Sequence, residues 1–354
     1  MSCFVSGCLL TGEPLGHGYS RSREYILFEG KRIDREGRHD IDEFADAVGH
    51  PLKLCSAVDS ASFVVLNEDY TKDKNRVYYK WISPGRFWIV ELVGADPTTF
   101  ESLDSDLARD SNHVWRTDTI MEGADAATAT VVRPHWVWKD RNRVYYQSTL
   151  IPNADPETFQ HLGSGYYRDK NMVLWCTTPI DDADMATFKV LGDSFLAKDK
   201  DNVYRSGYPF SEIDAATCRL HLHCTYGYQV FSDKNGVYVN GLKFLHADPT
   251  TFGIIDDLKG KGGKYVFLVD RWHCTPVTVY KEGGELITET VFYEKRTGKP
   301  LATVKAKVSG DTLKDISLSP APSNSTALPV PDWQIDVLKR PALVERMQAA
   351  GELL

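Results

Sequence analysis

The sequence predicts a mainly β protein, an array of about six hairpin-plus-short-helix repeats of roughly 30 residues, followed by a β meander and a terminal helix. Two motifs that recur in phase predict the array. Four strand-like segments after residue 264, of which the last two alternate polar and apolar residues, predict the meander. The chain has 354 residues, of which 42% are hydrophobic, so it can bury a sizeable core.

The first motif is an Asp-Lys-Asn turn that leads into aromatic and β-branched residues. Asp accepts N–H groups in turns, Asn tolerates tight turn dihedrals, and the Val-Tyr-Tyr residues that follow favour a strand. At the fourth turn position, Asn202 and Gly236 are expected to adopt a left-handed conformation. The leading aspartates of the six copies are Asp73, Asp110, Asp140, Asp169, Asp199 and Asp233.

The second motif, Ala-Asp-x-x-Thr-Phe, predicts one helical turn with Asp as its N-cap and Phe directed inward. Its aspartate follows that of the first motif by 15 residues in five copies and by 23 in the first copy. This phase indicates units that stack into a continuous core, and it leaves open a solenoid-like array or a propeller-like closure. The aspartates are Asp96, Asp125, Asp155, Asp184, Asp214 and Asp248.

Together the two motifs resemble the bacterial DKNYY repeat family, over roughly residues 60 to 255. Two positions depart from the pattern in the second copy, where Ser111 replaces Lys and Ala129 replaces Phe. The resemblance implies a fold of repeats. Because the family is defined by its pattern and not by an activity, the resemblance implies no catalytic residue.

The repeats are expected to lie between two flanking regions. Tyr25–Ile33 predicts a strand, a turn and a strand, and Asp40–Phe44 imitates the capped turn as part of a degenerate repeat. Lys259–Gly263 is expected to be a flexible hinge. The predicted parts are an N-terminal cap (1–60), the repeat domain (61–258), a β meander (264–318), a Pro/Ser-rich linker (319–331) and a helical segment (332–354).

Composition narrows the classes of function. The formal net charge is −8, which is unlike a protein that binds the phosphate backbone broadly and would instead attract a basic partner. No apolar run is long enough to span a membrane, and seven cysteines without a Cys-x-x-Cys pair are typical of free buried thiols. Val5–Cys8 matches the core of a lipoprotein cleavage site but lacks an apolar signal region before it. We therefore expect a cytoplasmic location.

An irregular copy supplies the candidate binding residues. About eight extra residues in the first repeat surround Pro84-Gly85, which predicts a long hairpin with a tight turn. Insertions in repeat arrays often lie on the binding face, and Trp and Arg dominate interface hot spots. The alternative is that the tryptophans cover an end of the array. The candidate partner-binding residues are Trp81, Arg86, Phe87 and Trp88.

The histidines, cysteines and acidic turns of the sequence offer two candidate groups of metal ligands. His221 and His223 share one face of a predicted strand, but Cys224, His273 and Cys274 complete no usual zinc spacing. The Asp-x-Asp/Asn turns lack the further ligands of a calcium loop, and turn capping accounts for them. No metal, cofactor or catalytic residue is expected.

The function predicted from these observations is that of a non-enzymatic, protein-binding repeat protein. A sharper hypothesis is a bacterial immunity protein that occludes a cognate toxin, with a basic toxin such as a nuclease as the partner, since acidity steers a basic protein toward it. No nucleic-acid or membrane partner is expected. The alternative is a carbohydrate-binding protein or a glycoside-active enzyme that uses the aromatic-rich strands as a sugar platform.

Overall fold

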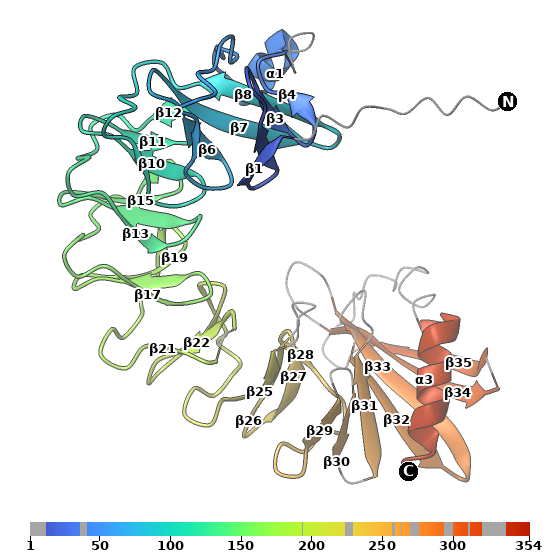
Figure 1. The fold of residues 1–354 in the computed structure, drawn as a ribbon. Helices are drawn as coiled ribbons and strands as arrows, with labels where there is room; N and C mark the ends of the chain where they lie inside the picture. The colour runs from blue at the N-terminus through green and yellow to red at the C-terminus, as the bar shows by residue number, and fades with distance from the viewer. Residues whose placement is uncertain are drawn as a thin grey trace, which may run out of the picture. The chain divides into compact units, whose positions relative to one another are not determined.

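The computed structural model describes residues 12–35, 41–192, 194–223, 229–256, 259–262, 264–269, 276–293, 300–310, 312–320 and 338–354. The described chain is mainly β, with small antiparallel sheets and two α-helices (Figure 1). It divides into two compact units, of which the first contains Met1–His161 with Tyr167–Met172 and the second contains Leu162–Tyr166 with Val173–Leu354. Neither described helix has the length and apolar content needed to cross a membrane.

The first unit is built from four-stranded sheets in which each strand pairs with the next along the chain. The helix α1 (Ile41–Val48) lies between the first and second sheets in sequence. The sheets are β1 (Glu13–Gly16), β2 (Tyr19–Arg21), β3 (Ile26–Phe28) and β4 (Lys31–Arg32); β5 (Val64–Val65), β6 (Tyr70–Lys72), β7 (Val77–Ser83) and β8 (Arg86–Glu91); β9 (Glu101–Ser102), β10 (Leu107–Arg109), β11 (Val114–Arg116) and β12 (Thr119–Ile120); and β13 (Thr130–Arg133), β14 (Val137–Lys139), β15 (Val144–Tyr146) and β16 (Thr149–Leu150).

The sheet β17–β20 includes the residues at which the two units are divided, and the second unit continues with two more four-stranded sheets. Each keeps the same order of pairing as the sheets of the first unit. The strands are β17 (Gln160–Gly163), β18 (Tyr166–Arg168), β19 (Val173–Trp175) and β20 (Thr178–Pro179); β21 (Lys189–Val190), β22 (Leu196–Lys198), β23 (Val203–Arg205) and β24 (Tyr208–Pro209); and β25 (Arg219–His223), β26 (Gln229–Asp233), β27 (Gly236–Val239) and β28 (Leu242–Lys243).

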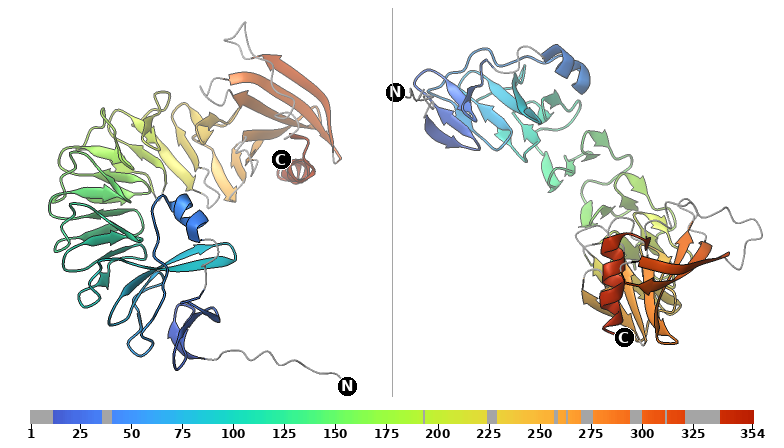
Figure 2. Two further views of the ribbon diagram at one scale, coloured as in Figure 1. Left: turned by 90° about the horizontal axis from the view of Figure 1, so that it is seen from above. Right: turned by 90° about the vertical axis from the view of Figure 1, so that its right-hand side faces the viewer.

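A seven-stranded antiparallel meander ends the second unit, and helix α3 (Pro341–Gly351) packs across one of its faces (Figure 2). Leu338, Leu343 and Met347 are buried against the sheet. The strands are β29 (Gly253–Asp256), β30 (Lys259–Gly262), β31 (Tyr265–Val269), β32 (Pro276–Glu282), β33 (Glu285–Tyr293), β34 (Pro300–Ser309) and β35 (Thr312–Pro320).

Neighbouring sheets share their apolar cores, which is why a single repeat does not need to bury its own aromatic residues. In the first unit, Tyr70 and Trp88 of one sheet pack with Trp115 of the next. In the second unit, Tyr166 packs with Tyr204 in the same way. The inward Phe of the second motif lies between the sheets, as Phe100 and Phe188 show. The stacking expected for repeats therefore holds within each unit.

Several expectations about local structure need correction. Lys259–Gly262 is strand β30 and not a hinge, because Phe252 packs on a strand that has no side chain at Gly260. Strand β35 was not expected, and it includes the first two residues of the predicted linker (319–331), the rest of which lies outside the described residues. Neither Asn202 nor Gly236 has a positive φ.

The left-handed residues instead lie in the turns at the other end of the sheets, such as Thr117 and Gln147. The Asn240-Gly241 turn has the positive φ values expected for a tight hairpin. Near the N-terminus, β3 and β4 confirm the strands predicted within Tyr25–Ile33. The predicted capped turn corresponds to an eight-residue helix, α1, and Asp40 lies outside the described residues.

Candidate functional site

The buried aspartate of the first motif joins two turns of the chain. The Asp199 carboxylate accepts the backbone N–H groups of Asp201 (2.8 Å) and Asn202 (2.6 Å) through Oδ1. Its Oδ2 accepts the Asp184 N–H (2.9 Å) and the Tyr204 hydroxyl (2.7 Å). Burial acts to raise the pKa of Asp199, but these hydrogen bonds outweigh it and hold the pKa below its usual value. We call this arrangement the clip.

The clip recurs at every copy of the first motif. All six leading aspartates are buried, and each accepts the N–H of the aspartate in the second motif that precedes it in the chain. In the first copy that partner is Asp59 of Val58–Phe63, a copy of the second motif that sequence analysis missed. Val58, Ser60 and Ser62 replace more typical residues there, but the spacing of Asp, Ser and Phe was a usable signal.

A second set of bonds closes each clip from outside. The Thr187 hydroxyl donates to Asp184 (2.8 Å) and accepts the N–H of Lys200 (3.0 Å). The Lys200 ammonium pairs with Asp184 at 2.8 Å. The same Ser/Thr bonds occur in all six clips, and four others have the cationic pair, whereas Ser111 leaves Asp96 without that lysine.

The opposite end of each sheet has a constant backbone but variable side chains. One residue just before or at the start of the second strand accepts a hydrogen bond through its carbonyl from the third strand or the turn after it, as when Gln147 N–H donates to Trp136 (2.6 Å). This bond identifies equivalent positions irrespective of side chain. The equivalent residues are Asp69, Asp106, Trp136, Gly165, Phe195 and Gln229.

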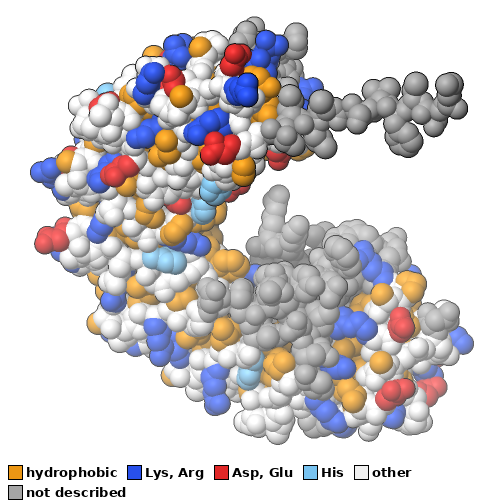
Figure 3. Space-filling view, viewed as in Figure 1, with side chains coloured by type: hydrophobic (Ala, Val, Ile, Leu, Met, Phe, Trp, Pro, Cys, Tyr) orange, Lys and Arg blue, Asp and Glu red, His pale blue; other side chains and the backbone are white. Residues whose placement is uncertain are grey.

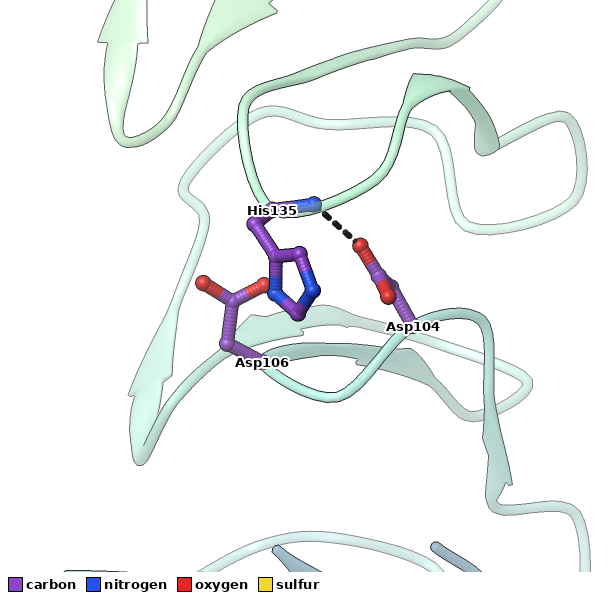
Figure 4. A group of neighbouring side chains, drawn as sticks. All are labelled: Asp104, Asp106 and His135. Carbon is purple, nitrogen blue, oxygen red and sulfur yellow. Dashed lines mark hydrogen bonds between the residues drawn. The ribbon is translucent and has the colours of Figure 1, made fainter. Parts of the chain in front are cut away.

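In the first unit this end carries a shallow, open hollow between the β9–β12 and β13–β16 sheets. Asp104 and Asp106 come from the β9–β10 turn, and His135 and Trp136 come from the β13–β14 turn. Figure 4 shows the His135 ring between the two carboxylates. Trp136 is 40% exposed, although the tryptophans of the repeat motif, such as Trp115, are buried.

Hydrogen bonds fix the walls of this hollow. The Asp104 carboxylate accepts the backbone N–H of His135, and the Ser105 hydroxyl lies 2.8 Å from His135 Nδ1. Arg116 donates to Asp106 Oδ2 at 2.6 Å. Burial raises the pKa of Asp106 above its usual value, despite the opposing charge of Arg116. The hollow therefore holds carboxylates that are partly withdrawn from water.

Comparison with protein families agrees with these features. A model of the DKNYY family matches residues 24–119, 53–176 and 166–272, which together span more than half of the chain. The chain belongs to the DKNYY family. No curated protein and no solved structure shows significant similarity to it.

In this DKNYY protein, the long β7–β8 hairpin forms as predicted, with Gly85 at a φ of 76°. Its residues Phe87 and Trp88 do not form an open aromatic patch. Trp88 is 4% exposed and stacks on Phe44 of α1, with ring centroids 4.0 Å apart, while Phe87 is 7% exposed and contacts Phe28. Phe87 and Trp88 are thus core residues, because α1 and the β1–β4 sheet cover the hairpin.

The other two candidate residues on this hairpin remain more accessible. Trp81 is half-buried, lies edge-on to Phe44 (5.8 Å) and donates its indole N–H to Asp118 (3.2 Å). Arg86 is exposed next to the turn. The structure does not bring either residue to the hollow, whose walls belong to other sheets of this DKNYY protein.

The described members of the two candidate metal groups form hydrogen bonds within this DKNYY protein. His221 Nε2 lies 2.8 Å from the Ser232 hydroxyl, and burial lowers the pKa of His221. The side chain of His223 and the residues Cys224, His273 and Cys274 lie outside the described residues. The leading aspartates of the Asp-x-Asp/Asn turns bind backbone N–H groups in the clips, as predicted.

Among the described residues, one group of potential metal ligands was not predicted from the sequence: Asp104, Asp106 and His135, whose ligand atoms lie within 4.8 Å of one another. The sequence signal that could have pointed to this end of the sheets is Trp136. It stands at a turn position where other copies have Asp, Gly, Phe or Gln.

Proposed function

We propose that this protein is a non-enzymatic, protein-binding repeat protein. The observation that carries this proposal is the difference between the two ends of the sheets. At one end, recurring side chains hold the clip together, and at the other end equivalent positions carry Asp, Trp, Gly, Phe or Gln. A constant scaffold with variable turn residues is the arrangement by which repeat proteins recognise partners.

The recurring acids are poorly suited to proton transfer. The Lys200 ammonium, together with Thr187, lowers the pKa of Asp184 to about 2, and the same kind of pair lowers the pKa of Asp155 and Asp214 to about 2. A general acid or base works best with a pKa near the operating pH. These carboxylates stay ionised at neutral pH, which supports a structural role.

The partner that fits best is a basic protein. The chain carries a net charge of −8, and on the face in Figure 3 acidic, basic and hydrophobic side chains are interspersed. Electrostatic attraction of this kind speeds encounter with a basic partner. Within this proposal, the sharper version is an immunity protein that neutralises a cognate basic toxin, such as a nuclease, by covering it.

The carbohydrate alternative loses the feature that suggested it. Most aromatic residues of the described strands are buried, and Tyr78, Trp115 and Tyr204 are at most 2% exposed, although Tyr208 is 77% exposed. A sugar platform needs aromatic faces open to solvent. The strand aromatics therefore support a packed core, and the protein-binding proposal is preferred.

The test is a titration of the purified full chain with the purified basic product of the neighbouring gene. Calorimetry and light scattering are expected to give a complex of fixed stoichiometry, and the toxin's activity should fall as the complex forms. Complex formation without loss of toxin activity would reject the immunity version alone. Failure to bind any protein, with specific binding on a glycan array, would reverse the order of the two proposals.

A further inference from the structure

The hollow lies at an end of the first unit where the charged residues of the turns are all acidic. In the sheets from β5 to β16, the residues that connect first to second strands and third to fourth strands include five carboxylates and no Lys or Arg. The clip turns at the other end contain Lys74, Arg76, Arg141 and Arg143. The five acidic residues are Glu68, Asp69, Asp104, Asp106 and Asp118.

The neighbouring cations only partly balance this charge. Arg116 is bound to Asp106, and Lys80 is buried with its ammonium 3.7 Å from Asp69. Arg133 lies over the Trp136 ring at 5.6 Å and donates to the Tyr167 hydroxyl at 3.1 Å. Asp104 has no Lys or Arg partner among the described ion pairs, and Glu68 is exposed nearby. An incoming positive charge would find carboxylates that are already partly desolvated.

The hollow also offers an apolar anchor. Trp136 is exposed beside Asp104 and Asp106, and its ring lies 5.8 Å from that of Tyr146. An arginine side chain combines a planar cation, which pairs with carboxylates, with a face that stacks on aromatic rings. The His135 imidazole, which is also planar and rich in nitrogen, already occupies the space between the two carboxylates. The ring is exposed, and an incoming cation would displace it from its contact with the Ser105 hydroxyl.

From these contacts we infer that the hollow is the docking site for an arginine side chain on a basic segment of the protein partner, with Trp136 as the stacking anchor and Asp104 and Asp106 as the charge partners. This inference rests on the proposed protein-binding function and adds the chemistry of the partner. It assigns recognition to the β9–β10 and β13–β14 turns, in place of the β7–β8 hairpin favoured by the sequence.

The test follows the indole N–H signals of the ¹⁵N-labelled full chain by NMR, with the Trp136 signal identified by its loss in Trp136→Phe. The probes are an acetylated nona-arginine peptide and the matching nona-citrulline peptide, which keeps the shape without the charge. We expect nona-arginine to shift the Trp136 signal in a saturable manner and nona-citrulline to leave it in place. An equal response to both peptides, or none, would overturn the assignment.

Variants locate the charge partners. Asp104→Asn is expected to weaken nona-arginine binding about tenfold, because one charge-assisted hydrogen bond is lost. If Asp104→Asn does not fold, Glu68→Gln, at an exposed position, is measured in its place. Asp201→Asn removes the same charge from an exposed residue of the second unit and should leave affinity unchanged. Equal effects of Asp104→Asn and Asp201→Asn would mean non-specific attraction and overturn the site.

Two further outcomes separate this inference from others. If Zn²⁺ or Mn²⁺ alone shifts the Trp136 signal and displaces the peptide, the Asp104, Asp106 and His135 group is a metal site and the inference is wrong. If the chain forms a stoichiometric protein complex in which Trp136 does not respond, the site is wrong and the protein-binding function stands. If Trp136 responds to arginine but no protein binds, the function is wrong and the cation site stands.

Discussion

The backbone N–H of Asp184 donates to Oδ2 of Asp199 at 2.9 Å, so that the second motif of one repeat is held by the first motif of the next. The two motifs are therefore parts of a single contact. Their fixed spacing in the sequence reflects this contact and does not require two independent local structures.

Removing the negative charge from a clip should destabilise the second unit. Asp199→Asn replaces one acceptor oxygen by an NH₂ group that faces N–H and O–H donors, and a buried unsatisfied group costs about 2 kcal/mol. Urea unfolding measures this loss. Asp201→Asn in the same turn is exposed and should change stability by less than about 0.5 kcal/mol. Equal losses in both variants would contradict the role given to Asp199.

Acid should weaken the clips. The Lys200 pair with Thr187 lowers the pKa of Asp184 to about 2, below the ordinary value of 3.8. The stabilisation from a lowered carboxylate pKa is fully present above the unfolded-state value and is lost as pH falls through the folded-state value. The melting temperature should thus be insensitive to this group above about pH 5 and fall between about pH 4 and pH 2. A melting temperature that stays constant down to pH 2 would contradict this.

The lysine of each clip can be tested in the copy that lacks it. Asp96 has no lysine partner because Ser111 occupies that position, whereas Asp184 is paired with Lys200. In Ser111→Lys, the pKa of Asp96, read from its carboxyl ¹³C shift, should fall further. In Lys200→Met, the pKa of Asp184 should rise toward its ordinary value. Ser111→Ala is the control and should leave the pKa of Asp96 unchanged.

Truncating the Trp88 side chain should lower the free energy of unfolding of the N-terminal sheets. The Trp88 ring is 4% exposed and stacks on Phe44, so Trp88→Ala should cost about 3–5 kcal/mol through loss of contacts and a residual cavity. Chemical denaturation followed by tryptophan fluorescence measures it. Ile82→Ala, on the same hairpin but 58% exposed, should have little effect. Loss of partner affinity without loss of stability in Trp88→Ala would restore the hairpin as a binding device.

A side chain at Gly260 should disturb the last core. A Cβ atom there would lie 2.6 Å from Phe252 Cζ, so Gly260→Ala should destabilise the second unit by about 1–3 kcal/mol. Gly283→Ala is not a suitable control. No atom lies within 4 Å of a Cβ at Gly283, but its φ of 59° would strain any side chain there. The better control is Gly260→Ala with Phe252→Leu, which should recover part of the loss in a thermal melt.

The repeats could be predicted from the sequence because their information is local. The turn at Asp199, the capped turn at Asp184 and the inward Phe188 each follow from residue types at short spacing. The clip itself escaped prediction, because pairing the motifs across copies required knowing that the carboxylate of Asp199 has a second oxygen directed at the preceding turn. Glycine content suggested a hinge at Gly260, but the approach of Phe252 is a tertiary contact.

The candidate site was predicted less well than the fold. An insertion containing Trp81 and Trp88 was visible in the sequence, but its cover, α1 with Phe44, was not. Trp136 lies within the regular repeat, and in the sequence it cannot be told apart from the buried Trp138, which is the same residue type two positions later. Trp136 is exposed because it lies in a turn, before strand β14 begins. Predicting this exposure required the boundaries of β14.

The clip has a consequence for how such a chain can grow or shrink. In five copies the two aspartates that it joins are only 14 or 15 residues apart, so each junction can close from a short stretch of chain without waiting for distant segments. The sixth junction tolerates a separation of 19. Duplication or deletion of one whole period would regenerate an intact junction, so the length of the array and the number of turn surfaces it displays can change in evolution without a new core having to be invented.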